Sequence, residues 1–280
     1  MHLFSKCVKY LSWGCTFLVL VLILFLFGYI FYRGAGAVTW EFLSGVPKGA
    51  IIGSEGGILP AITGSLLYTG TALLIAFIPS SASALYLVYY QTNSLPGMIL
   101  KLVIQCISGI PSIVFGLFGY SFLVMSLGWG RCILSGGVTL GLMIIPFIEV
   151  RLENAMRQLP VCLTEQSDAL GVSRFYMIRH LVFPCILPEM VSAFLLGGCY
   201  AMGAAAPLIF TGAVFNAPVT VNLMSPAMAL PNHLYSLLTQ GVSDENAYGT
   251  AFVLMIIVLT VNLGSTYMAR RNSFRWKKKR

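Results

Sequence analysis

The side chains that could do chemistry are few and gather in one part of the chain. Between Glu153 and Met190 the sequence is hydrophilic and of mixed charge, whereas no Asp, Glu, Lys or Arg occurs between Glu189 and Asp244. Just before this stretch, Glu149 and Arg151 could line a path for an anion, since a guanidinium matches an oxyanion well. The alternative is that both side chains extend toward water or pair with neighbours.

Signals of catalysis and metal binding are missing from the sequence. We find no pairing of nucleophile and base, no carboxylate cluster and no Walker motif. The seven cysteines are scattered and never stand in a CxxC or Cys/His spacing, so neither a zinc site nor a disulfide framework is predicted. His233 has no ligand-type residues nearby and is interpreted as a surface residue. We expect no enzyme and no metal site.

The composition indicates which solvent surrounds the chain. Of its 280 residues, 58% are hydrophobic and 9% are charged, which is far more apolar than a soluble domain of this size. A spanning helix needs roughly 20 apolar residues. The predicted fold is all-α, a polytopic membrane helix bundle with about six transmembrane helices, at about 11–32, 62–90, 98–127, 133–152, 190–211 and 247–268.

The basic residues predict the orientation in the membrane. With the N-terminus inside, only Arg33, Lys48 and Arg131 of the 17 Lys and Arg residues lie outside, as the positive-inside rule favours. Both termini should be cytoplasmic. The formal charge of +8 therefore reflects membrane topology and does not indicate nucleic acid. The basic tail, Arg270 to Arg280, could contact anionic lipid headgroups or simply hold the C-terminus inside.

We divide the chain into three parts. Residues 1–60 form a retained first helix and an outward-facing segment, residues 61–270 form a core, and residues 271–280 form the basic tail. The apolar run near the N-terminus is too long for the core of a signal peptide. Pro and Gly residues interrupt the spans, either around a path or to allow close helix packing; they are Pro79, Gly109, Pro111, Gly116 and Gly119.

The cytoplasmic loop, residues 153–189, is the most informative part of the core. Pro160 and Pro184 bracket a helical pattern, and Gly171 can end a first short helix in a left-handed cap. Ser173 is a suitable N-cap for a second short helix. A helix, glycine turn and helix would project from the membrane domain, where a soluble partner could bind it.

The residues of this loop resemble a known family. Glu165 to Ser173, followed by Phe183-Pro184 and Leu187-Pro188, is similar to the EAA loop of ABC importer permeases, although Gln166 and Ser167 replace alanines and Glu189 replaces a common glycine. The resemblance implies a type I importer permease architecture in which the loop docks on an ATPase. The residues given this role are Glu165, Asp168, Ala169, Leu170, Gly171, Pro184 and Pro188.

Other segments carry a narrower resemblance. Gly56-Gly57-Ile58, Ile110 to Gly119, and Glu153 to Arg157 with Leu159-Pro160 look like the A-type permease of the phosphate importer. This resemblance implies a multi-pass subunit of the bacterial inner membrane that acts with a second permease, an ATPase dimer and a periplasmic or lipid-anchored binding protein. ATP and Mg would be used by the ATPase, with no cofactor on this chain.

The fifth span departs from that subfamily. Phosphate permeases typically carry an arginine and then GETAPL there, whereas residues 200–208 of this chain read YAMGAAAPL. We name a candidate translocation path from Arg151, Tyr200, Gly203, Ala204 and Pro207. Two alternatives stay open: a diverged permease for another ligand, and an ion-coupled secondary transporter, which would need inverted repeats and buried acidic residues.

Overall fold

The computed structural model describes residues 2–48, 53, 55–90, 95–160 and 162–277; of residues 2–7, 162–164, 168 and 269–277 it describes no side chains. Within these residues the regular structure is helical apart from one short antiparallel pair, β1 (Pro47–Lys48) and β2 (Glu55–Gly56), and an isolated bridge between Ala213 and Ala227. The helices are α1 (His2–Gly34), α2 (Trp40–Ser44), α3 (Leu59–Leu85), α4 (Leu95–Ser108), α5 (Ser112–Gly119), α6 (Ile133–Arg157), α7 (Cys162–Ala169), α8 (Arg174–Met177), α9 (Phe183–Gly203), α10 (Ala206–Thr211), α11 (Leu230–Thr239) and α12 (Asp244–Lys277). A 3-10 turn follows α1 at Ala35–Ala37, and π-helical turns lie at Tyr86–Tyr90, Tyr120–Ser126 and Ile178–Val182.

Among the described residues, five stretches of helix are long and apolar enough to cross a membrane, and a bent pair brings the number to as many as six. The predicted polytopic helix bundle is therefore confirmed. The five stretches are Val8–Ala37, Leu59–Tyr90, Ile133–Arg157, Arg174–Gly203 and Asp244–Met268.

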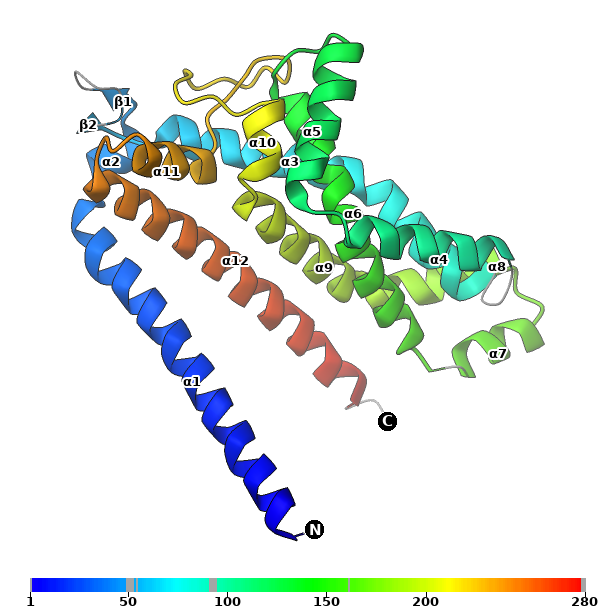
Figure 1. Cartoon of the computed structure of the whole chain (residues 1–280). Helices are drawn as coiled ribbons and strands as arrows, with labels where there is room; N and C mark the ends of the chain where they lie inside the picture. Colours follow the sequence, from blue (N-terminus) through cyan, green and yellow to red (C-terminus); the bar gives the residue numbers. More distant parts are fainter. Residues whose placement is uncertain (1, 49–52, 54, 91–94, 161, 278–280) are drawn as a thin grey trace.

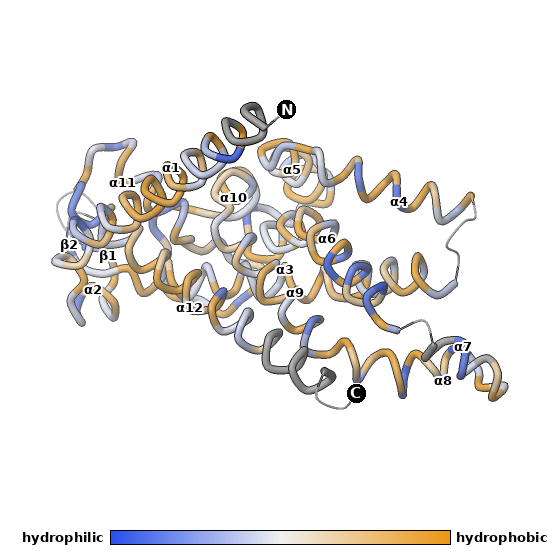
Figure 2. Tube along the Cα trace, turned by 90° about the horizontal axis from the view of Figure 1, so that it is seen from below, coloured by the Kyte–Doolittle hydropathy of each residue, from blue (hydrophilic) through white to orange (hydrophobic). Residues whose placement is uncertain are grey.

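The third predicted span, 98–127, is not one straight helix. Leu95–Ser108 and Ser112–Ser126 meet at an angle of 97°. Pro111 explains the break, because its ring disfavours helical geometry at the preceding residue and it has no N–H to donate. Gly109 just before it adds backbone freedom. The α4 half leaves the bundle and carries apolar residues along its length (Figure 2).

The fifth predicted span, 190–211, has different bounds in the structure. The spanning helix begins at Arg174 and ends at Gly203, and α10 is a separate short helix. Ala204 breaks the helix, since its backbone is extended (φ −83°, ψ 106°). Pro207 lies in the first turn of α10, where its missing N–H costs no hydrogen bond.

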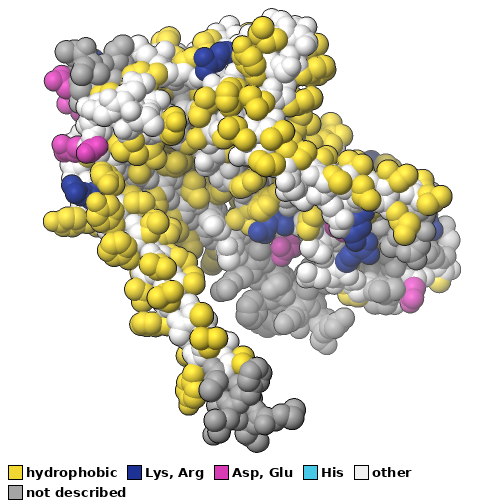
Figure 3. Space-filling view, viewed as in Figure 1, with side chains coloured by type: hydrophobic (Ala, Val, Ile, Leu, Met, Phe, Trp, Pro, Cys, Tyr) yellow, Lys and Arg dark blue, Asp and Glu magenta, His cyan; other side chains and the backbone are white. Residues whose placement is uncertain are grey.

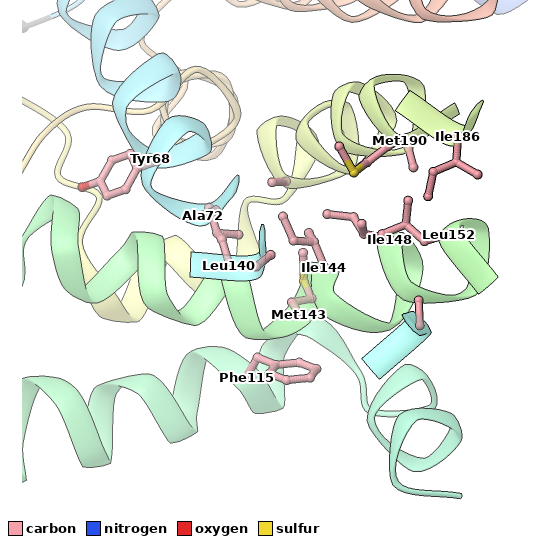
Figure 4. Close-up of a cluster of buried hydrophobic side chains, with 14 of the residues drawn as sticks. Tyr68, Ala72, Phe115, Leu140, Met143, Ile144, Ile148, Leu152, Ile186 and Met190 are labelled. Carbon is pink, nitrogen blue, oxygen red and sulfur yellow. The ribbon is translucent and has the colours of Figure 1, made fainter. Parts of the chain in front are cut away.

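The core lies where α6 packs between α3, α5 and α9 (Figure 4). Tyr68 of α3 is buried, and its hydroxyl lies 3.3 Å from the carbonyl oxygen of Ala227. Along α6, glycines leave room for α3: a Cβ on Gly137 would lie 2.0 Å from Thr71 Oγ1. Small residues thus allow close approach of two membrane helices.

The two ends of the bundle differ. Both chain termini and α7 lie at one end, whereas β1, β2, α2 and α11 lie at the other (Figure 1). Hydrophobic side chains cover α1 between these ends (Figure 3). None of the apolar window of α1 is buried within this chain, so its surface is left for lipid or another subunit.

Candidate functional site

The short helix α7 ends as its glycine predicts. Gly171 has φ +66°, and the N–H of Val172 donates to the carbonyl of Ser167 at 3.1 Å. This six-to-one hydrogen bond with a left-handed glycine is a Schellman motif. The predicted helix cap at Gly171 is therefore confirmed.

The second short helix begins at the predicted cap. Ser173 Oγ accepts a hydrogen bond from the N–H of Tyr176 at 3.3 Å. The turn between α7 and α8 presents apolar side chains to the outside, because Leu170 is 79% exposed and Phe175 is 68% exposed. An exposed apolar tip at the end of a membrane bundle indicates a binding surface for another protein. We call residues 162–177 the knob.

The predicted loop residues fall into two groups. Glu165, Ala169, Leu170 and Gly171 lie on the knob and are exposed. The side chain of Asp168 lies outside the described part of the chain. Pro184 and Pro188 lie within α9, so the second helix continues through Pro184 into the membrane span.

The knob is joined to two spanning helices. Chain continuity connects α8 directly to α9 through Ile178–Val182. In addition, Arg174 Nη1 donates to the carbonyl of Tyr89, at 3.0 Å, in the π-helical turn that ends the α3 span. A displacement of the knob therefore acts on the α3 and α9 spans together.

Two of the path residues are linked by an aromatic side chain that sequence reasoning missed. The Arg151 guanidinium lies 4.8 Å from the centre of the Phe147 ring, and that ring stacks on Tyr200 at 5.6 Å. The cation–π contact holds the Arg151 guanidinium beside Phe147 and leaves its positive charge intact. The four-residue spacing of Phe147 and Arg151 on one helix is the signal that could have revealed the pair.

The other path residues surround the break between α9 and α10. Gly203 is exposed, and nothing lies within 4 Å of a Cβ placed there. Ala204 forms the break itself, and Pro207 packs closely on Gly116 of α5, where an added Cβ would lie 2.9 Å from Pro207 Cα. Arg151 and Tyr200 are thus joined, while Pro207 serves helix packing.

Glu149 corrects one interpretation drawn from the sequence. Its side chain does not extend to water: it is 1% exposed, and Oε1 has no hydrogen-bond partner among the described residues. The adjacent carboxylate, Glu153, is paired with Arg157 at 2.8 Å. Burying a carboxylate oxygen without a partner is unfavourable by about 1–3 kcal/mol.

His233 corrects a second interpretation drawn from the sequence, that this histidine lies at the surface. It is 3% exposed, lies in α11, and stacks on Phe215 with 5.9 Å between ring centres. Burial lowers the pKa of His233 from 6.5 to about 4, so the imidazole is neutral. The prediction of a surface histidine failed because the outward loop 212–246 contains an amphipathic helix whose apolar side carries His233 inward.

The chain belongs to the family of binding-protein-dependent transport system inner membrane components, which it matches over residues 81–278. It is 32% identical to the probable phosphate transport system permease protein PstA of Methanocaldococcus jannaschii over 74% of each chain. It is 28% identical to the probable ABC transporter permease protein YqgI of Bacillus subtilis over 91% of each chain.

Solved structures share the fold. The methionine ABC transporter MetNI, in an inward-facing conformation, matches 77% of this chain and 95% of its own with a TM-score of 0.64 at 18% identity. A bacterial ABC transporter involved in the import of alginate matches 97% of this chain with a TM-score of 0.60 at 16% identity. The chain is therefore a multi-pass ABC importer permease subunit.

Proposed function

We propose that this chain is a permease subunit of an importer of inorganic phosphate, driven by ATP hydrolysis in a separate subunit. The observation that carries the substrate is the identity of 30–32% with phosphate permeases over about three quarters of the chain. The Arg151 guanidinium, held over the Phe147 ring, supports this choice of substrate because a guanidinium can bind an oxyanion.

The knob supports the coupling half of the proposal. Its exposed turn docks on an ATPase dimer, and the continuity of α8 with α9 transmits the movement of that dimer to the spans. The partners are a second permease, the ATPase dimer, and a periplasmic or lipid-anchored binding protein. The termini and the knob face the cytoplasm of a bacterial inner membrane, as the distribution of basic residues favours.

The test is uptake of radiolabelled phosphate by vesicles that hold this chain with its partner permease, ATPase and binding protein. Uptake that needs ATP and resists competition by unlabelled sulfate and molybdate is the expected result. The Arg151→Gln variant should lower uptake about tenfold, as loss of one charge-assisted hydrogen bond does, while Lys9→Gln on α1 should not. ATP hydrolysis without phosphate movement would overturn the choice of substrate.

A second candidate is a permease for another ligand, and the uncharged segment Gly203 to Ala206 favours it. A pair of variants separates the two candidates. Tyr200→Arg with Ala204→Glu should raise phosphate uptake markedly if this chain has lost part of an anion path. Unchanged uptake would instead indicate a path adapted to a different ligand.

A further inference from the structure

A cavity of about 440 Å³ lies at the end of the bundle next to the knob. One side of it comes from α6 and its C-cap, through Arg151, Asn154, Ala155 and Gln158. The other comes from α9, through Glu189, Ser192 and Ala193. The spacings of three, four and seven residues place each set on one side of its helix. Two helix faces therefore line the cavity, which is open to the outside because Arg151, Asn154 and Glu189 are exposed.

The cavity is polar, which is unusual for a membrane bundle. Five of the seven lining residues have polar side chains. Ser192 is 6% exposed, and its hydroxyl lies 2.7 Å from that of Ser265 on α12. This contact fixes one wall, while the Phe147 ring fixes Arg151 on the other.

The two charges of the cavity have opposite signs and do not pair. Within the described residues the ion pair is Glu153 with Arg157, and Arg151 and Glu189 form none. Both line the same space, so a ligand can contact both. Such a ligand must offer a negative oxygen to the guanidinium and a hydrogen-bond donor to the carboxylate, because an ionised carboxylate only accepts.

We propose that the cavity between α6 and α9 binds a protonated oxyanion, with Arg151 binding its charge and Glu189 accepting its proton in a hydrogen bond. This inference rests on the proposed function and deepens it. Hydrogen phosphate keeps a proton at neutral pH, whereas sulfate keeps none. Glu189 therefore repels sulfate, since the two negative groups have no hydrogen between them, and accepts hydrogen phosphate.

The volume indicates how the site holds its ligand. At about 440 Å³ the cavity lies within the range of ligand sites, yet it is larger than a bare tetrahedral oxyanion. Water fills the remaining space and bridges the ligand to the amides of Asn154 and Gln158. Binding is weak and reversible, as a passage site requires.

The experiment uses the full chain, purified with its partner subunits in lipid nanodiscs, and the ³¹P line width of millimolar phosphate. Wild type should broaden the line, and added sulfate should not relieve the broadening. Glu189→Gln keeps the shape and adds a donor, so sulfate should compete at a concentration about tenfold lower. Glu189→Asp, which keeps the acceptor, should retain the discrimination, and Glu245→Gln at the other end of the bundle should behave as wild type.

Two results would overturn the inference. If sulfate relieves the broadening equally in wild type and in Glu189→Gln, the carboxylate does not select the ligand. If glycine relieves it and sulfate does not, the cavity binds a zwitterion instead. Uptake of phosphate by sealed vesicles reconstituted from the same purified subunits separates this from the proposed function: uptake that persists while either result is found leaves the importer intact and removes only the site at Glu189.

Discussion

Glu149 and His233 each bury a polar atom that has no hydrogen-bond partner among the described residues. The first is a carboxylate inside a span, and the second an imidazole near the opposite end of the molecule from the knob. Unsatisfied buried polar groups are uncommon and unfavourable. His233, which lies outside the spans, therefore connects the stability of the fold with protonation in an accessible pH range.

We predict that His233 makes the fold sensitive to acid. The pKa of His233 is about 4 in the fold and 6.5 as a free group. Between these two pH values the unfolded chain takes up a proton and the folded chain does not. The contribution of neutral His233 to stability is therefore fully present above pH 6.5 and is lost as the pH falls toward 4. The free energy of unfolding should fall by about 2 kcal/mol between pH 8 and pH 5. Denaturation of the detergent-purified chain measures this.

The control for this prediction is a second histidine. His233→Leu should flatten the pH dependence, while His180→Leu, at an exposed position on the knob side, should leave it unchanged. An equal loss of stability in acid for wild type and His233→Leu would show that other groups are responsible.

Pairs of elements decide both the packing and the coupling of this bundle. The α3 and α6 helices approach closely because glycines of α6 face Tyr68, Thr71 and Ile75 of α3. The knob instead depends on a turn, in which Gly171 takes a left-handed conformation between α7 and α8. A substitution at an α6 glycine therefore changes how α6 packs on α3, and a substitution at Gly171 changes how α7 is oriented to α8.

Gly137→Ala should weaken the α3 and α6 contact. The added Cβ would lie 2.0 Å from Thr71 Oγ1 and 2.6 Å from Thr71 Cβ, so the helices must separate, at a cost of about 1–3 kcal/mol. Thermal unfolding in detergent should shift downward. Gly70→Ala in α3, with nothing within 4 Å of its Cβ, is the matched control and should unfold near the wild-type temperature.

Gly171→Asp should uncouple ATP hydrolysis from transport. A side chain at φ +66° strains the turn by about 1–2 kcal/mol, and the added charge alters the docking surface. Uptake should fall while the subunits still assemble. Gly241→Asp is a matched control, since Gly241 has φ +62° after α11 and its neighbour Val242 donates to Leu237. Normal coupling in Gly171→Asp would remove the docking role.

The two ends of the molecule carry different elements. One end holds the termini and the knob, and the other holds the strand pair and α11 (Figure 1). The cavity between α6 and α9 lies toward the first end, while α11 covers the second: its backbone N–H at Leu230 donates to Ser65 of α3, at 2.7 Å.

Cysteine labelling tests the orientation of these ends. In a chain freed of its own cysteines, a membrane-impermeant maleimide should label Glu55→Cys and Glu245→Cys in intact cells. It should label Glu165→Cys, on the knob, only after the membrane is opened. Labelling of position 165 in intact cells would reverse the orientation and place the knob away from any cytoplasmic ATPase.

Much of this protein follows from local sequence. Apolar length predicts the spans, because the thickness of the bilayer sets how many residues each needs. Gly171 and Ser173 predict the two-helix knob, because a left-handed turn and an N-cap depend on neighbouring residues only. The tertiary structure decided what depends on distant segments: the burial of His233, and the cavity shared by Arg151 and Glu189. Each requires helices far apart in the chain to meet, and hydrophobic periodicity does not say which faces will do so.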